Sequence, residues 1–72
     1  MKQDISKVNV GDLWVWEKPS LVVGVSDDSI DLYVPEGTQD YFHSEQVLDN
    51  QTIRVKKHYF QSSMRDYGYY FK

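Results

Sequence analysis

The sequence predicts an all-β domain folded as a small barrel or sandwich, and three observations lead to this prediction. Short runs rich in β-branched and aromatic residues recur at intervals of roughly 8–12 residues, between turn-forming residues. Several of these runs alternate apolar and polar residues, as a half-buried strand does. Before residue 56, no segment keeps a helical period long enough for a helix of three turns. Many short, evenly spaced strands are typical of small β-barrels and sandwiches.

The first expected strand is Leu13 to Glu17, within the stretch VGDLWVWEK. Successive side chains of a strand point to opposite faces, so we predict that Leu13 and Val15 face the interior and that Trp14 and Trp16 face the other side. Burying one Trp removes on the order of 150–250 Å² from water, so a small domain should not leave two of them exposed. We therefore expect the C-terminal segment, a second copy of the chain or a partner protein to cover them.

Two more strands are expected in the first half of the chain. Leu21 to Val25 is rich in β-branched residues, and Gly24 within it indicates a bulge or a close crossing. A turn follows at Asp27-Asp28-Ser29, because short polar side chains can bond their own backbone there. Ile30 to Val34 then alternates, with its aliphatic side chains inward and Tyr33 outward.

The second half of the chain carries weaker signals. Pro35-Glu36-Gly37 fits a β-turn with proline at its second position. Thr38 to Phe42 is predicted as a fourth strand, and residues 44–48 as one helical turn capped by Ser44. Thr52 to Lys56 alternates again and is predicted as a fifth strand.

The C-terminal segment, HYFQSSMRDYGYYFK, is compatible with a sixth strand, a short helix near Ser62 to Tyr67, or an aromatic arm. Six aromatic residues fall between positions 59 and 71, which is too many for a disordered end. Most of them should pack on the second face of the sheet. We predict a single domain spanning residues 1–72, in which residues 8–56 form the barrel and residues 57–72 an aromatic, basic segment packed on it.

The predicted core takes the inward positions of the strands and the aliphatic residues of the helical turn. It comprises Leu13, Val15, Leu21, Val23, Val25, Ile30, Leu32, Val34, Val47, Leu48, Ile53 and Val55.

A family resemblance follows from the order of these features. An opening of the form VxxGDLWVW, two hairpins and a single turn (SEQVL) before the last strand resemble the layout of SH3-like barrels, over about residues 8–56. The resemblance implies a barrel of five or six short strands with one helical turn near residues 44–48. The ALYDY-type motif of SH3 domains that read proline-rich peptides is absent from this sequence. Small SH3-like barrels also recur among nucleic-acid-binding proteins and among accessory proteins of phages and bacteria.

Charge is distributed unevenly along the chain, whose net charge is −3. Residues 19–53 contain no Lys or Arg but seven acidic residues, whereas residues 54–72 contain five Lys and Arg against one acidic residue. Such asymmetry can steer charged partners, although exposed charges are screened beyond about 8 Å at physiological salt. The acidic middle of the chain favours a basic partner.

Catalytic and metal-binding patterns are weak in this sequence, so we expect no enzyme activity and no cofactor. There is no cysteine, no Gly-x-Ser-x-Gly turn and no glycine-rich phosphate loop. The pairs Asp40/His43 and Asp28/Asp31 supply two ligands each, and two ligands seldom hold a metal. The first ten residues lack the apolar run of a signal peptide, and no segment approaches the ~20 apolar residues of a membrane span. We therefore expect a soluble, cytoplasmic protein.

The function predicted from these features is non-catalytic protein binding. One specific form of it is a small inhibitor whose carboxylates imitate the phosphates of DNA. Aromatic anchors ringed by charge are typical of binding hot spots. The predicted site has an aromatic face and an acidic surround that selects a basic partner: Trp14, Trp16 and Tyr33, with Asp27, Asp28, Asp31, Glu36 and Asp40. A homodimer is a further option, since pairing buries surface that a short chain cannot bury alone.

The alternative function is nucleic-acid binding through the C-terminal segment. Cations neutralise phosphates and aromatic rings stack on bases. The residues available for this are Arg54, Lys56, Lys57, Tyr59 and Arg65.

Overall fold

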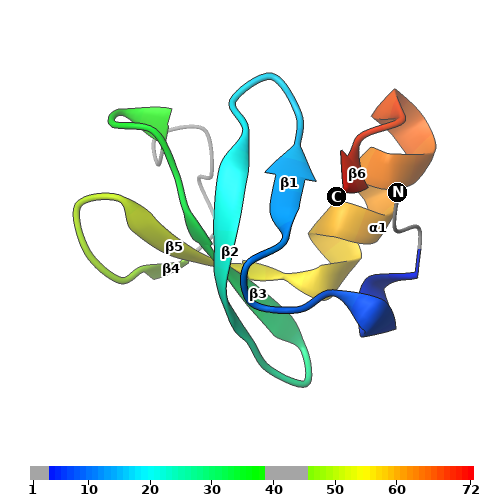
Figure 1. Cartoon of the computed structure of the whole chain (residues 1–72), viewed down its shortest axis with the longest axis horizontal. Helices are drawn as coiled ribbons and strands as arrows, with labels where there is room; N and C mark the ends of the chain where they lie inside the picture. The colour runs from blue at the N-terminus through cyan, green and yellow to red at the C-terminus, as the bar shows by residue number, and fades with distance from the viewer. Residues whose placement is uncertain (1–3, 39–45) are drawn as a thin grey trace.

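A computed structural model describes residues 4–38 and 46–72 of the chain (Figure 1). Within these residues it contains one antiparallel sheet of six strands, an α-helix and a short 3₁₀ helix. In chain order the elements are η1 (Ile5–Lys7), β1 (Leu13–Val15), β2 (Ser20–Val25), β3 (Ser29–Tyr33), β4 (Gln46–Val47), β5 (Thr52–Lys56), α1 (Lys57–Tyr67) and β6 (Tyr70–Phe71).

The strand order is β4-β5-β3-β2-β1-β6, so the last strand of the chain pairs with the first. Helix α1 leaves the end of β5 and returns the chain to the free edge of β1, where β6 pairs with it. Figure 1 accordingly shows α1 and β6 together on one side of the molecule and the β4–β5 hairpin on the other. The described strands form an open sheet with β4 and β6 at its edges. The mainly-β fold is confirmed, but closure into a barrel is not seen.

The central strands form where alternation and turn residues predict them. β5 has the predicted bounds, and β2 and β3 each begin one residue earlier than expected. The pairing of β2 with β3 shifts register between Val22 and Gly24, which confirms the expected bulge. Gly24 is also a close crossing, because a Cβ there would lie 2.7 Å from Oδ2 of Asp31.

The C-terminal segment forms a longer helix than the predicted one near residues 62–67. α1 starts directly after β5, and its buried residues are Phe60 and Ser63, with Met64 partly buried. This spacing of three and four residues is that of one helix face. The helix ends at Gly68, whose φ of +73° is the left-handed conformation typical of a helix C-terminus. Tyr70 and Phe71 form β6, so the segment is both helix and strand.

Two predictions for the middle of the chain need correction. Gln46 and Val47 form strand β4, paired with β5, where a helical turn was expected. The turn after β3 places proline first, because the N–H of Thr38 donates to the carbonyl of Pro35 at 3.0 Å. The predicted strand at residues 38–42 lies, apart from Thr38, outside the described residues.

The core lies between the sheet and α1, and it is centred on aromatic rings. Trp14 is fully buried, with its ring centroid 4.9 Å from that of Phe60 and 4.6 Å from that of Phe71. Each ring comes from a different element: β1, α1 and β6. The core comprises these three residues and Val8, Val22, Ile30, Leu32, Val34, Ile53 and Val55.

The predicted facing of β1 and β2 is therefore wrong. Leu21, Val23 and Val25 were expected in the core but are 43%, 40% and 41% exposed, and Leu13 and Val15 are only half-buried. For Leu13, Val15, Leu21 and Val23 the physical reason is that α1 and β6 cover the Trp14 side of β1, so the opposite side is left to solvent. Val25 instead lies opposite the buried Ile30, at the end of β2 next to the hairpin turn. Val47, in the short edge strand β4, and Leu48, directly after it, are also exposed. Ile30, Leu32, Val34, Ile53 and Val55 are confirmed as core residues.

Candidate functional site

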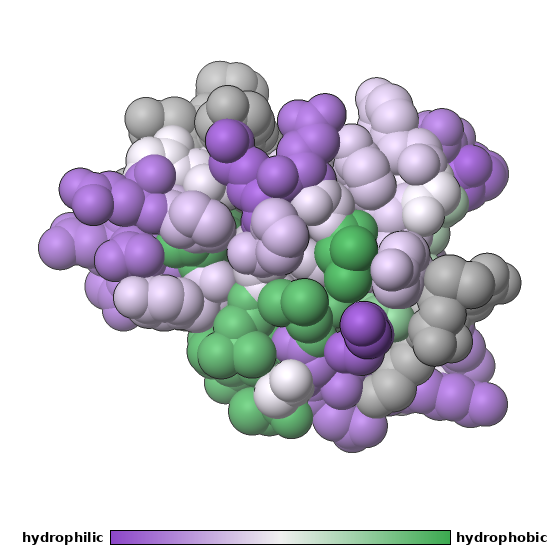
Figure 2. Space-filling model, turned by 45° about the horizontal axis from the view of Figure 1, so that its top comes forward, coloured by the Kyte–Doolittle hydropathy of each residue, from purple (hydrophilic) through white to green (hydrophobic). Residues whose placement is uncertain are grey.

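The outer face of the sheet, which points away from the core, carries a group of exposed apolar side chains. Leu13 on β1 lies opposite Leu21 on β2, which in turn lies opposite Tyr33 on β3, so the three share this face. Val23 lies two residues further along β2. We call Leu13, Leu21, Val23 and Tyr33 the outer patch. Leu21, Val23 and Tyr33 are 40–47% exposed. Figure 2 shows hydrophobic side chains gathered from the centre of one face to its lower edge, with hydrophilic residues on either side.

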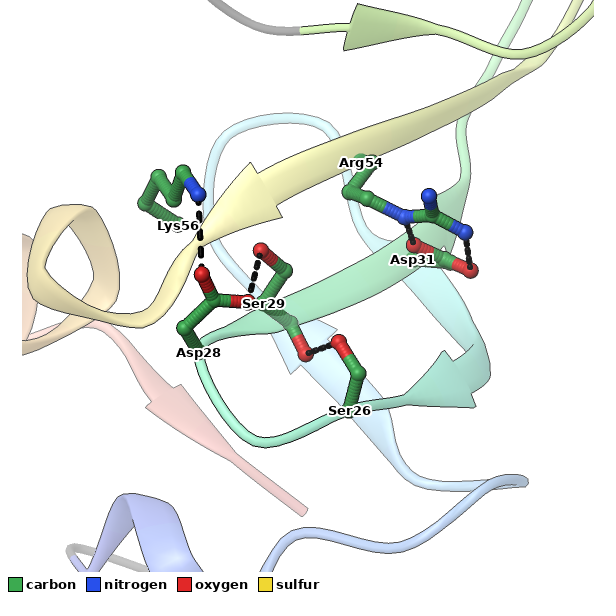
Figure 3. A network of polar contacts seen from close by, with 6 residues as sticks. All are labelled: Ser26, Asp28, Ser29, Asp31, Arg54 and Lys56. Atoms are coloured by element: carbon green, nitrogen blue, oxygen red, sulfur yellow. Dashed lines mark hydrogen bonds and ion pairs between the residues drawn. The ribbon is translucent and has the colours of Figure 1, made fainter.

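An ion pair lies beside the outer patch. Arg54 on β5 is opposite Asp31 on β3, and its Nε and Nη2 donate to the two carboxylate oxygens of Asp31 at 2.9 and 3.3 Å (Figure 3). This hydrogen bonding raises the pKa of the Arg54 guanidinium. The Asp31 carboxylate occupies the space that a side chain at Gly24 would fill. The pair therefore bridges β3 and β5 with no net charge.

A second ion pair closes the end of the β2–β3 hairpin. Nζ of Lys56 donates to Oδ2 of Asp28 at 2.9 Å, and Oγ of Ser29 donates to Oδ1 at 3.0 Å (Figure 3). The hydrogen bond from Lys56 is the main reason why the pKa of Asp28 lies below its ordinary value. The backbone N–H of Lys57 donates to the Asp28 carbonyl at 2.8 Å. Asp28 thus joins the hairpin to the end of β5 through its carboxylate and to the start of α1 through its backbone carbonyl.

The aromatic face predicted from the sequence does not form. Trp14 lies in the core, on the side of the sheet opposite Tyr33. Trp16 is half-buried beyond the end of β1, where its Nε1 donates to Oγ of Ser20 at 3.1 Å and its ring meets Tyr69 edge to face at 6.4 Å. Of the three predicted anchors, only Tyr33 contributes to the outer face.

The predicted acidic surround is only partly available to a partner. Asp28 and Asp31 bind cations of the same chain. Asp27 and Glu36 are exposed at opposite ends of β3. Asp40 lies outside the described residues.

The residues predicted for nucleic-acid binding do not form one cationic surface. Arg54 and Lys56 pair with Asp31 and Asp28, and Nε of Arg65 lies 3.0 Å from Oδ1 of Asp66. Tyr59 is half-buried and packs against the core, and Lys57 is half-buried at the start of α1.

A shallow cleft of about 650 Å³ lies away from the outer face, between η1, the second half of α1 and β6. Its ionisable groups have local roles: Asp4 accepts hydrogen bonds from the N–H and Oγ of Ser6 and so caps η1, and Arg65 pairs with Asp66. Burial is the main cause that raises the pKa of Tyr69 there. The lining residues are Asp4, Ile5, Gln61, Met64, Arg65, Gly68, Tyr69 and Tyr70.

Residues 4–38 and 46–72 contain neither a candidate metal site nor a candidate membrane-spanning helix. No three or more His, Asp or Glu side chains gather there as a metal site. None of the helices in that part has the length and apolar character of a membrane span.

The sequence analysis missed three residues of the outer patch, because it assigned them to the core: Leu13, Leu21 and Val23. The stretch LVVGV is apolar at successive positions, so alternation within it cannot tell which side is buried. The only available signal was the excess of aromatic residues in the C-terminal segment, which had to cover one face of β1.

Comparison of the chain with models of protein families, with curated proteins and with solved structures found no match.

Proposed function

We propose that this chain is a non-catalytic protein-binding module and that the outer patch is its contact surface. One observation carries the proposal: Leu21, Val23 and Tyr33 lie together on one face, 40–47% exposed, although Trp14, Phe60 and Phe71 are fully buried on the other. Contiguous exposed apolar side chains with a polar surround are typical of interaction sites. Tyr33 adds an aromatic ring, a residue type enriched in binding hot spots.

The proposal includes an SH3-like layout for the fold. Its support is the strand order, in which the first and last strands are neighbours and β1, β2 and β3 follow one another as a meander. The open edge at β4 is where the described sheet departs from a closed barrel.

Nucleic-acid binding and DNA mimicry have less support than protein binding. Three of the cations needed for the first, Arg54, Lys56 and Arg65, are paired with carboxylates of the same chain. Two of the carboxylates needed for the second, Asp28 and Asp31, are neutralised by those same pairs. Protein binding requires neither set of charges to be free.

A capture experiment tests the proposal with one substitution in the outer patch and one outside it. Leu21→Lys places a charge in the patch, and Val10→Lys places the same charge at a residue that is 64% exposed but lies outside the strands. We expect proteins captured from host cells by the wild-type chain to be captured by Val10→Lys and lost with Leu21→Lys. Equal capture by both variants, with unchanged circular dichroism, would contradict the proposal.

A further inference from the structure

We infer that the occupant of the outer patch is a second copy of this chain, related to the first by a twofold axis. This inference rests on the proposed function and names the partner of the same face. The sequence predicts a basic partner instead, and the inference differs because the carboxylates of this face are paired with cations of the same chain.

The outer face holds no surplus of negative charge that would select a basic partner. Strand register places Asp31, Arg54 and Lys56 on this face, and Lys72 lies opposite Leu13, with which it exchanges backbone hydrogen bonds of 2.8 and 2.9 Å. Asp31 is neutralised by Arg54, and Lys56 by Asp28.

The same neutrality allows two copies to meet on this face. The whole chain carries a net charge of −3, so two copies repel each other overall. On the outer face the Asp31–Arg54 pair carries no net charge, and Lys72 lies at the β6 edge. Like-charge contact therefore does not oppose association there, whereas it opposes a contact through the Asp27 end of the hairpin.

The shape of the face also suits self-association. A twofold interface brings the same patch from both copies together, and an apolar patch is complementary to itself. Gly24 adds no side chain of its own to the face beside Val23, and the Asp31 carboxylate fills the space above it. Tyr33 of the other copy can pack there, with its ring against the Arg54 guanidinium, as aromatic rings and Arg often do. Face-to-face sheets pack about 10 Å apart in this way.

A whole side of this molecule is about as large as an ordinary interface. A stable interface buries about 800 Å² per partner. The chain has 4540 Å² of accessible surface on a body of 28 × 23 × 20 Å, so an average side of this body has roughly 760 Å². The edges of the sheet offer much less, because β4 and β6 have two residues each. Short edge strands are poor sites for strand-to-strand pairing, so the face is the better contact.

Sedimentation equilibrium of the full chain between about 1 μM and 1 mM tests the inference. We expect the wild-type chain and Val10→Lys to form dimers with the same dissociation constant. We expect Leu21→Lys to raise that constant by about tenfold or more, because it brings two like charges together across the axis. Leu21→Thr suits a strand and carries no charge, so it serves if the lysine variant fails to fold, with a smaller rise expected.

Salt dependence separates this dimer from one held by charges. Contacts between uncharged apolar side chains are not screened, so the dissociation constant should change less than about threefold between low and high salt. A wild-type chain that stays monomeric at 1 mM, a dimer dissociated by salt, or equal effects of Leu21→Lys and Val10→Lys would overturn the inference.

The proposed function fails on different results. If the wild-type chain is monomeric but captures a partner that Leu21→Lys does not capture, the proposed function holds and the second copy is not the occupant. If Leu21→Lys changes neither self-association nor capture, both proposals are wrong.

Discussion

Gly24 shows how one residue determines the chemistry of the outer face. It lies at the bulge of β2, and Asp31 on the neighbouring strand leans into the space that a larger residue would occupy. That position allows the Asp31 carboxylate to meet Arg54 with two hydrogen bonds. A missing side chain on one strand thus allows an ion pair between the next two strands.

Gly24→Ala should destabilise the fold by about 1 kcal/mol, because the new Cβ lies 2.7 Å from Oδ2 of Asp31 and the carboxylate must move. The φ of Gly24 is not positive, so alanine itself fits the backbone. In an Asp31→Ala background the clash is absent, and Gly24→Ala should then cost nearly nothing. Urea unfolding of the four proteins in this double-mutant cycle measures both values. Equal costs in the two backgrounds would show that the carboxylate is not the obstacle.

At the scale of elements, β1 is held in place by two parts of the chain that follow it by more than forty residues. α1 contributes Phe60 and β6 contributes Phe71, and Trp14 packs between them in a cluster with no hydrogen-bond partner for its Nε1. Trp16 lies at the margin of this cluster, and its Nε1 donates a hydrogen bond to Ser20. The two indoles therefore contribute very differently to stability.

Trp14→Ala should cost about 3–5 kcal/mol, the usual range for deleting a buried aromatic side chain. Trp16→Ala should cost about 1–2 kcal/mol, since it loses partial burial and one hydrogen bond. Tyr67→Ala is the control, because Tyr67 is 71% exposed and should change stability little. Denaturant unfolding monitored by circular dichroism gives all three values. Should Trp14→Ala not fold, Trp14→Phe keeps the comparison measurable, as it removes no hydrogen bond.

Strands were predictable where apolar and polar residues alternate, and β5 at Thr52–Lys56 is the clearest case. α1 was underestimated because aromatic residues favour strands and because Ser63 occupies one of its buried positions, which breaks the apolar stripe. The buried face of β2 could not be read from LVVGV, since both of its sides are apolar. Only the distant Phe60 and Phe71 decide which side is covered.

The candidate site was less predictable than the strands. The Asp31–Arg54 pair joins residues 23 positions apart, and it depends on the register between β3 and β5. A one-residue change of register would place the two side chains on opposite faces. The sequence showed both charges, but it did not show that they neutralise each other.

At the scale of the whole molecule, folding turns an uneven charge distribution into local pairs. The acidic residues of β3 and its hairpin lie next to the basic residues of β5, so Asp28 and Asp31 meet Lys56 and Arg54. Ion pairs exposed to water each contribute little to stability. Their larger effect is electrostatic, because the paired cations cancel the negative potential of Asp28 and Asp31. An uncharged surface can therefore approach the outer face without an electrostatic penalty from these two carboxylates.

Stability should fall on both the acidic and the alkaline side of neutrality, for opposite reasons. The pKa values of Asp4, Asp28 and Asp49 are lowered in the folded chain by hydrogen bonds, from Ser6, Lys56 and Gln51 respectively. A lowered carboxyl pKa stabilises the fold above the ordinary value of 3.8, and this contribution is lost as the pH falls through the folded values. The pKa of Tyr69 is instead raised, mainly by burial, so its contribution is present below the ordinary value of 10.0 and is lost as the pH rises beyond it.

Thermal unfolding midpoints should therefore be nearly constant from about pH 5 to pH 9, and should decrease below about pH 4 and above about pH 10. Asp28→Asn should flatten the acidic decrease without changing the alkaline one, because the Asn amide takes up no proton as the pH falls. Tyr69→Phe should flatten only the alkaline decrease, because phenylalanine has no hydroxyl to ionise. The other described tyrosines are unchanged in this variant, so any general effect of high pH on tyrosines would still be seen. An acidic decrease of the same steepness in Asp28→Asn and in the wild-type chain would mean that the Lys56 pair does not persist in solution. The hairpin would then still be joined to the start of α1 by the backbone hydrogen bond from Lys57 to Asp28.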